Sequence, residues 1–433
     1  MAAVVLLAAA AGAARARTSA NGHGVGSLYA FAGTPARLHA VDPRTLRVRH
    51  GRSAATAGHI FGWSFSPDRS RLAAGSDSTA EVRLYDLRRL RALGDVALVP
   101  PSVSGLVAAT TWASPSRAVA VVVSPGCCGL GDTTVSGIDA DTSRELWRRD
   151  LHGSLQSGAA YRGGFVLVLG PKLSIGTSRL DVVDADGSVR TVWLDRIRSG
   201  WRRSGSGAQV IAHQWNPGLA LDRSTGRAFV IQAGAPVAEV DLRRLAVRYH
   251  ELSEPISFFG RLRDWLEPKA EAKGMQGPER RVVWIGNGRL AVAGVDHELS
   301  TRNGQEQETD TPAGLKLVDT RSWSVRTLDR TTTTVTFAHG ILFATGTSWD
   351  SRASKMTGAG LSAYDAGGHE LYHRYGAEQI FGVTPMPRGV LVSGNLASSV
   401  YPREDLVDAR SGRVIGHAGV DLQLIAGDQS FWF

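Results

Sequence analysis

Cysteine is nearly absent from this sequence: the 433 residues contain two, Cys127 and Cys128, and these are adjacent. So few cysteines exclude a disulfide-rich scaffold and the spaced cysteine pairs of structural zinc sites. Lysine is scarce as well, with five lysines among the 49 basic residues. The net charge of +9 therefore rests on arginines. Because these are dispersed as doublets rather than clustered on one element, we expect no nucleic-acid partner.

Long apolar runs are also missing. No segment beyond the N-terminus reaches the roughly 18 to 20 continuous apolar residues that a spanning helix needs, so we expect no membrane span in the mature chain. Residues 2–14 are small and apolar, and the Ala-Arg-Ala at 14–16 fits a processing site. We expect residues 1–16 to be a signal peptide, with an Ala-rich leader as the alternative. The mature protein would then be secreted or extracytoplasmic, in the periplasm or at the cell surface.

Glycine, by contrast, is abundant, and the 50 glycines stand singly between apolar runs, as turns require. One short pattern recurs along the chain: apolar, any residue, apolar, Asp, then a turn of four to five residues. Successive aspartates are separated by 44, 53, 45, 57, 78, 46 and 43 residues. A four-stranded propeller blade has about 40 to 50 residues. The eight aspartates are Asp42, Asp86, Asp139, Asp184, Asp241, Asp319, Asp365 and Asp408.

A second pattern lies between the aspartates: an alternating strand, a tight turn and another strand, which is typical of a hairpin. Seven such hairpins are complete, at 63–75, 111–123, 160–170, 221–231, 284–294, 337–346 and 385–394. An eighth hairpin, at 422–433, ends the chain. The first unit, which begins with the strand at 28–31, has no inner hairpin before it, so the C-terminal strand can complete this N-terminal blade. The sequence therefore predicts an all-β fold, a single propeller over 27–433 with eight four-stranded blades, closed circularly by the N- and C-terminal strands. Seven blades is the alternative, because 28–31 and 431–433 compete for one strand.

The long interval between Asp241 and Asp319 contains two departures from the repeat. Phe258, Leu262 and Trp265 are three to four residues apart, which predicts one inserted helix near 254–275 whose apolar stripe packs on the rim. The polar residues 296–312 are expected to form a long loop.

Short stretches resemble known propeller repeats. The run Ser-Phe-Ser-Pro-Asp at 64–68, continued through Val-Arg-Leu-Tyr-Asp at 82–86, resembles a WD-repeat or TolB-type blade. The run Gly-Leu-Ala-Leu-Asp at 218–222 is similar to the Tyr-Val-Thr-Asn repeat of surface-layer propellers. Residues 138–147, ending in Trp147, resemble the pyrroloquinoline-quinone-type repeat. These resemblances imply the β-propeller superfamily without selecting a member, and that fold hosts enzymes and binders alike.

The adjacent cysteines lie in a Gly-rich stretch, and in an exported protein Cys127 and Cys128 are candidates for a vicinal disulfide. Some quinone-dependent alcohol dehydrogenases carry such a bond beside their cofactor, which makes pyrroloquinoline quinone the alternative to a disulfide that only shapes the loop. The pairs Asp139/Asp141 and Asp184/Asp186 space oxygen ligands as calcium loops do. Neither continues to a bidentate Glu, which favours ordinary turns, so we expect no cofactor and no metal.

No catalytic motif accompanies the remaining candidates. The main hypothesis is a non-enzymatic, monomeric propeller that binds a protein partner or small ligand through loops at one end of its pore. Those loops carry Cys127 and Cys128, residues 197–209, the helix near 254–275 and residues 296–312. The rival hypothesis is a pore-centred enzyme, quinone-dependent or a metal-dependent hydrolase or lyase. Candidate binding residues are His59, His213, Trp215, His339, Arg202, Arg203 and Trp265.

Overall fold

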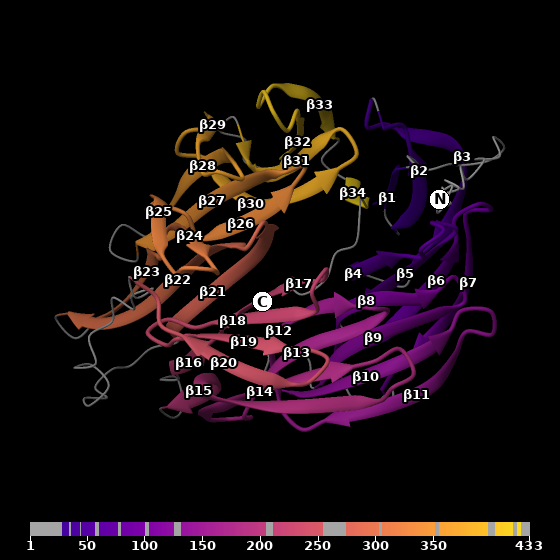
Figure 1. Cartoon of the computed structure of the whole chain (residues 1–433). Helices are drawn as coiled ribbons and strands as arrows, with labels where there is room; N and C mark the ends of the chain where they lie inside the picture. Colours follow the sequence, from indigo (N-terminus) through magenta and orange to yellow (C-terminus); the bar gives the residue numbers. More distant parts are fainter. Residues whose placement is uncertain are drawn as a thin grey trace, which may run out of the picture.

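The computed structural model describes residues 28–33, 36–43, 45–56, 60–76, 79–99, 104–124, 131–204, 211–253, 274–302, 305–350, 355–396, 403–418 and 422–425. Within these residues the chain is all-β, with 34 strands and no α-helix. Figure 1 shows the strands grouped in sheets around a common centre, which is the arrangement of a β-propeller. The predicted all-β fold and single propeller are confirmed.

Five of the sheets are separate and have four antiparallel strands each. Apart from β34, which pairs with β1 from the other end of the chain, each strand in these sheets pairs with a neighbour in sequence. The sheets are β4 (Ile60–Phe65), β5 (Arg71–Ser76), β6 (Glu81–Asp86), β7 (Arg91–Ala97); β8 (Leu106–Ser114), β9 (Arg117–Ser124), β10 (Asp132–Asp139), β11 (Arg144–Leu151); β17 (Gly218–Asp222), β18 (Arg227–Ile231), β19 (Val237–Asp241), β20 (Ala246–His250); β30 (Gln379–Met386), β31 (Gly389–Asn395), β32 (Arg403–Val407), β33 (Val414–Ala418); and β1 (Leu28–Ala32), β2 (Arg37–Val41), β3 (Val48–Ala55), β34 (Leu422–Ile425).

The sixth sheet, which we call the composite sheet, has fourteen strands. It contains three groups of four strands in the hairpin order of the repeat, β12–β15, then β21, β22, β24 and β25, then β26–β29. Its strands are β12 (Ser154–Tyr161), β13 (Gly164–Gly170), β14 (Ile175–Val183), β15 (Val189–Ser204), β16 (Ile211–Trp215), β21 (Gly274–Gly286), β22 (Arg289–Arg302), β23 (Gln305–Pro312), β24 (Leu315–Asp319), β25 (Val325–Asp329), β26 (Thr334–Ala338), β27 (Ile341–Asp350), β28 (Lys355–Asp365) and β29 (Glu370–Arg374).

The described strands thus form six sheets, so the predicted eight blades, and the alternative of seven, are both wrong. The physical reason is lateral pairing. Strand β16 pairs with both β15 and β21, and β23 pairs with both β22 and β27. These two extra strands hydrogen-bond three groups into one sheet, which repeat spacing along the chain does not reveal.

The ring is closed by the two ends of the described chain. Strand β34 pairs antiparallel with β1, with Tyr29 opposite Ile425 and Ala32 opposite Leu422. This pairing confirms the predicted circular closure, through residues 422–425. The competing stretch 431–433 lies outside the described residues.

Apolar side chains fill the spaces between neighbouring groups of strands. Leu391 and Leu406 of the last sheet pack with Leu28 and Leu424 of the closing sheet, and all four are buried. Similar clusters lie between the other neighbouring groups. The core is therefore divided among the contacts between groups and holds each one in place.

The two ends of the ring differ. The repeated aspartates end the third strand of each group, at what we call the Asp-turn end. Antiparallel order places the start of the first strand, the end of the second, the start of the third and the end of the fourth at the opposite end, which we call the extension end. There β15, β21, β22, β27 and β28 continue beyond the length of the regular strands. Figure 1 shows β15, β16, β21, β22 and β23 on one side of the molecule.

Three expected irregular segments are partly strand. Of the expected loop at 197–209, residues 197–204 belong to β15 and the rest lie outside the described residues. Residues 296–312 form most of the β22–β23 hairpin rather than a loop, because both strands find antiparallel partners despite their polar sequence. Of the expected helix near 254–275, residues 254–273 lie outside the described residues. Its last two residues, Gly274 and Met275, are strand, because they pair with Ile211 and Ala212 of β16.

Candidate binding surface at the extension end

The repeated aspartates hold turns, as expected from their positions. In seven of the eight repeats the carboxylate accepts a hydrogen bond from a backbone N–H of the following turn. These hydrogen bonds lower the pKa of Asp139, Asp241 and Asp319. The exception is Asp184, whose turn is held by Asp186 through the N–H of Ser188 at 2.9 Å.

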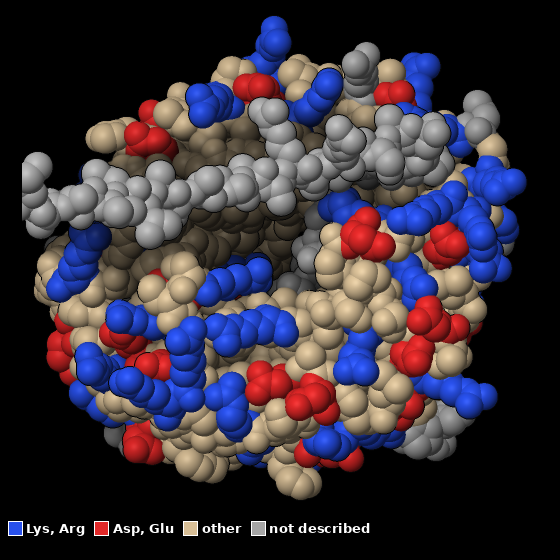
Figure 2. Space-filling view, turned by 45° about the vertical axis from the view of Figure 1, so that its right-hand side comes forward, with Lys and Arg blue, Asp and Glu red and all other residues tan. Residues whose placement is uncertain are grey.

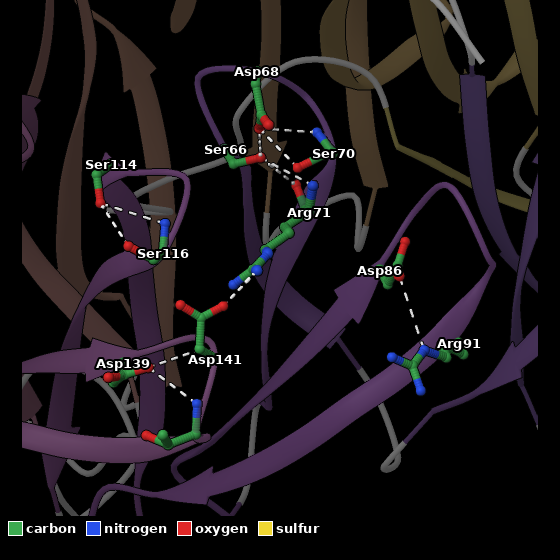
Figure 3. Close-up of polar contacts among 11 residues, drawn as sticks. Ser66, Asp68, Ser70, Arg71, Asp86, Arg91, Ser114, Ser116, Asp139 and Asp141 are labelled. Carbon is green, nitrogen blue, oxygen red and sulfur yellow. Dashed lines mark hydrogen bonds and ion pairs between the residues drawn. The ribbon is translucent and has the colours of Figure 1, made fainter. Parts of the chain in front are cut away.

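Both expected calcium-like pairs therefore belong to turns. Figure 3 shows Asp139 facing the backbone of its own turn, while Asp141 faces Arg71 of the neighbouring sheet. Among the described residues, no group of three or more His, Cys, Asp or Glu side chains is arranged to hold a metal ion.

Several arginines link one group of strands to the next. Each reaches the turn that follows a repeated aspartate in the neighbouring group, and together they give part of the arginine content a structural role. The contacts are Arg71 Nη2 to Asp141 Oδ1 at 2.6 Å, Arg149 Nε to the Gly187 carbonyl at 2.7 Å, Arg190 Nη1 to the Leu242 carbonyl at 2.9 Å, and Arg289 Nη1 to the Ala366 carbonyl at 3.0 Å. On the face shown in Figure 2, basic and acidic side chains are interspersed around a central hollow.

The structure separates the predicted binding residues. His59, Trp265, Cys127 and Cys128 lie outside the described residues. His339 lies in the β26–β27 turn, and its Nε2 lies 2.8 Å from the Met386 carbonyl and 3.0 Å from the Gly389 carbonyl of the next sheet. With a proton on Nε2, His339 donates to these carbonyls and joins two sheets, away from the extension end.

The other four predicted residues come together in one hairpin. Arg202 and Arg203 are on β15, and His213 and Trp215 are on β16. Arg202 lies directly opposite His213, and Trp215 lies opposite Gly200. Directly opposed residues share a face of a sheet, so Arg202, His213 and Trp215 face the same way.

This face continues onto β21. Strand β16 runs parallel to β21, with His213 opposite Gln276. Arg198 also belongs to the face, because it is two residues from Gly200 and four from Arg202 on β15. Arg198 and Arg202 are exposed, whereas the other side chains are half-buried. We call the set Arg198, Arg202, His213, Trp215 and Gln276 the basic–aromatic face.

The electrostatics of this face are set by Arg202 and by burial. Burial and the nearby positive charge of Arg202 lower the pKa of His213 below its ordinary value of 6.5. His213 is therefore neutral at pH 7, and its ring has both a hydrogen-bond donor and an acceptor.

Deeper in the ring, β21 and β22 contain a buried ion pair that the sequence did not suggest. Arg280 Nη1 lies 2.7 Å from Asp296 Oδ1, and the two side chains are 0% and 1% exposed. The same nitrogen donates to the Glu279 and Val295 carbonyls at 2.8 and 3.2 Å. Burying two charges costs desolvation free energy, which the attraction between them offsets only when their geometry is close. The fifteen residues between its members carry no local signal of the contact.

A second pair faces the opposite way. His297 Nδ1 lies 2.6 Å from Asp310 Oδ1, across the β22–β23 hairpin, and both side chains are mostly buried. Because neighbouring residues of a strand point to opposite faces, His297 is on the other side of the sheet from Asp296. This pair therefore supports the hairpin rather than the basic–aromatic face.

Comparisons with known proteins support the fold but not a family. No protein-family model matches the sequence, and no curated protein matches it. The structure is similar to "Dihydro-heme d1 dehydrogenase NirN in complex with DHE", at 12% identity and a TM-score of 0.54, over 96% of this chain and 77% of that one. Two others are Sqt1 of Saccharomyces cerevisiae (12% identity, TM-score 0.49, 86% and 91%) and BamB from Moraxella catarrhalis (12%, 0.44, 86% and 97%).

At 12% identity the likeness to NirN shows the propeller fold alone. It agrees with the propeller fold expected from the short repeats. Among the described residues, none forms a helix long and apolar enough to cross a membrane.

Proposed function

We propose that this chain is a binding protein that takes its ligand or partner on the extension end of the propeller. One observation carries this proposal: at that end, strands of three groups pair through β16 and β23 into a continuous sheet. Regular blades do not need such lateral pairing to fold. A surface built on paired strands is rigid, which favours binding because little conformational entropy is lost.

The positions of the departures from the repeat support the proposal. The described ends of the stretch containing Cys127 and Cys128, Ser124 and Asp132, lie opposite each other at the extension end. The β15–β16 and β22–β23 hairpins lie at the same end. Function in propellers and other scaffolds is concentrated in such departures, because the regular strands are constrained by packing.

Photo-crosslinking at single sites tests where binding occurs. Met356 is 41% exposed on the part of β28 that lies at the extension end, whereas exposed Arg223 lies in the β17–β18 turn at the Asp-turn end. A photo-reactive residue is placed at either site in the full chain, in its cell of origin. We expect specific adducts from position 356 and none from 223. Equal yields, or adducts from 223 alone, would contradict the proposal.

We further propose that the protein acts outside the cytoplasm, as the apolar residues 2–14 and the Ala-Arg-Ala at 14–16 suggest. Fractionation and intact mass of the mature chain test this, since processing would remove residues 1–16. The same mass measurement, with alkylation before and after reduction, tests the pairing of Cys127 with Cys128. Bound metal, or a quinone absorbance in the purified protein, would overturn the non-enzymatic part of the proposal.

A further inference from the structure

The basic–aromatic face contains two exposed arginines, Arg198 and Arg202. Neither Arg198 nor Arg202 takes part in an ion pair among the described residues, whereas Arg71 faces Asp141 and buried Arg280 faces Asp296. The charge of these two arginines is therefore not neutralised by the part of the protein that the structure describes.

Their neighbours also do not neutralise them. The residue directly opposite Arg202 is His213, which is neutral at pH 7, and the next residue across the sheet is Gln276. A carboxylate opposite Arg202 would be the stabilising choice in a sheet, and neutral His213 supplies no negative charge there. Across the sheet from Arg202, the paired positions on β16 and β21 therefore carry no acidic residue.

We propose that the basic–aromatic face binds an oxyanion group, a carboxylate or a phosphate, of the molecule taken at the extension end. The inference rests on the proposed function for its location. The planar guanidinium of Arg202 matches the paired oxygens of either group. The His213 ring and the Gln276 amide add hydrogen-bond donors. Half-buried Trp215 provides an aromatic flank for the adjoining part of the ligand.

Two simple anions test the inference and distinguish its sources. The full chain is titrated separately with inorganic phosphate and with acetate at constant ionic strength, and the ring resonances of His213 are followed by NMR. We expect a saturable shift with at least one anion at millimolar concentration. A response to phosphate alone indicates a phosphate-bearing ligand, and a response to acetate indicates a carboxylate.

Arg202→Gln should weaken this binding by roughly tenfold or more, because it removes a charge-assisted pair of hydrogen bonds. Arg223→Gln is the matched control, since Arg223 is equally an exposed arginine without an ion pair among the described residues, and it should change nothing. Arg202→Lys keeps the charge and loses the planar fork, so its affinity should fall between the two.

Two results would overturn the inference: no saturable response to either anion, or equal affinity in Arg202→Gln and the unchanged protein. Thermal unfolding of each variant shows whether it is folded before the titration. If the anions fail while crosslinking at position 356 still gives adducts, the oxyanion inference falls and the proposed location of binding remains.

Discussion

The separate sheets and the composite sheet use the same four-stranded hairpin unit, but they differ at the extension end. In the separate sheets the strands stop after four to nine residues, whereas β15 has 16, β21 has 13 and β22 has 14. The extended strands pair with the extra strands β16 and β23, and the Arg280–Asp296 ion pair is buried between β21 and β22. This side of the ring therefore combines structural support with exposed polar groups. The difference teaches that extension, rather than a change of repeat, creates the candidate surface.

The largest expected effect comes from the buried ion pair of the composite sheet. Asp296→Asn leaves the Arg280 charge buried without its carboxylate, and we expect a loss of about 3–5 kcal/mol in the free energy of unfolding. Urea denaturation measures it. Glu251→Gln is the control, because the Arg196–Glu251 pair is 52% and 72% exposed and should contribute about 0–1 kcal/mol. Similar losses from both variants would remove the distinction between the regions.

The next effect concerns ring closure in a separate sheet. Ile425 is fully buried on β34, which has four residues, so Ile425→Ala should cost about 2–4 kcal/mol. Ile285→Ala on β21 removes the same volume from a strand that β16 and β22 pair on its two sides over part of its length. Hydrogen exchange should show wider loss of protection in the closing sheet. Faster exchange around β21 instead would reverse this ranking.

A pH effect is expected at the contact between the last sheet and the closing sheet. Glu404 on β32 lies on the same face as buried Leu406, and its Oε1 accepts a hydrogen bond from Ser393 Oγ at 3.0 Å. Its Oε2 is buried without a hydrogen-bond partner among the described residues. Burial raises the pKa of Glu404 from 4.5 to about 7.

Because this pKa is raised, the folded state favours the protonated carboxyl. Stability should therefore fall as pH rises from about 4.5 to about 7, and the loss is complete above that range. Glu404→Gln should be more stable than the unchanged protein by about 1–3 kcal/mol at pH 8 and nearly equal at pH 4.5. Exposed Glu370→Gln should leave the pH profile of unfolding as it is. A Glu404→Gln profile parallel to that of the unchanged protein would refute the assignment.

A smaller effect tests the repeated turns, which both regions share. Asp408→Ala removes an acceptor for the N–H of Ser411, and we expect a loss of about 1 kcal/mol at neutral pH. Hydrogen bonds to Ser411 lower the pKa of Asp408, so this contribution is present above its unfolded pKa and disappears as pH falls through the folded one. Asp184→Ala should cost less, since Asp186 accepts the N–H of Ser188 in that turn. Equal losses of stability in the two variants would show that the hydrogen bond from the turn N–H to the aspartate does not cause the loss.

The smallest effect is electrostatic. Arg202→Gln removes one of the two causes that lower the pKa of His213, so this pKa should rise while burial continues to hold it below 6.5. An NMR titration of the ring protons measures the change. If the pKa does not move, Arg202 does not act on His213 and the basic–aromatic face loses its electrostatic basis.

Part of the candidate surface was predictable. Residues 197–209 and 296–312 were recognised as departures because they interrupt a regular spacing, and His213 and Trp215 stood out as a polar and aromatic cluster. Gln276 was not recognised, because its position opposite His213 depends on a parallel pairing between strands 63 residues apart. Arg280 and Asp296 were missed for a similar reason: neither is unusual until both are placed inside the sheet.

The sequence by itself determined the hairpins and the Asp-held turns, because each depends on alternation and turn chemistry within about ten neighbouring residues. The propeller and its circular closure were predictable from the repeat along the whole chain, since the first unit lacks an inner hairpin that the last unit supplies. The number of sheets was decided by the tertiary structure alone. The pairing of β16 with β21 and of β23 with β27 depends on which backbone edges the closed ring brings together. Because backbone hydrogen bonding is almost independent of side-chain identity, no residue pattern predicts these lateral strand pairings.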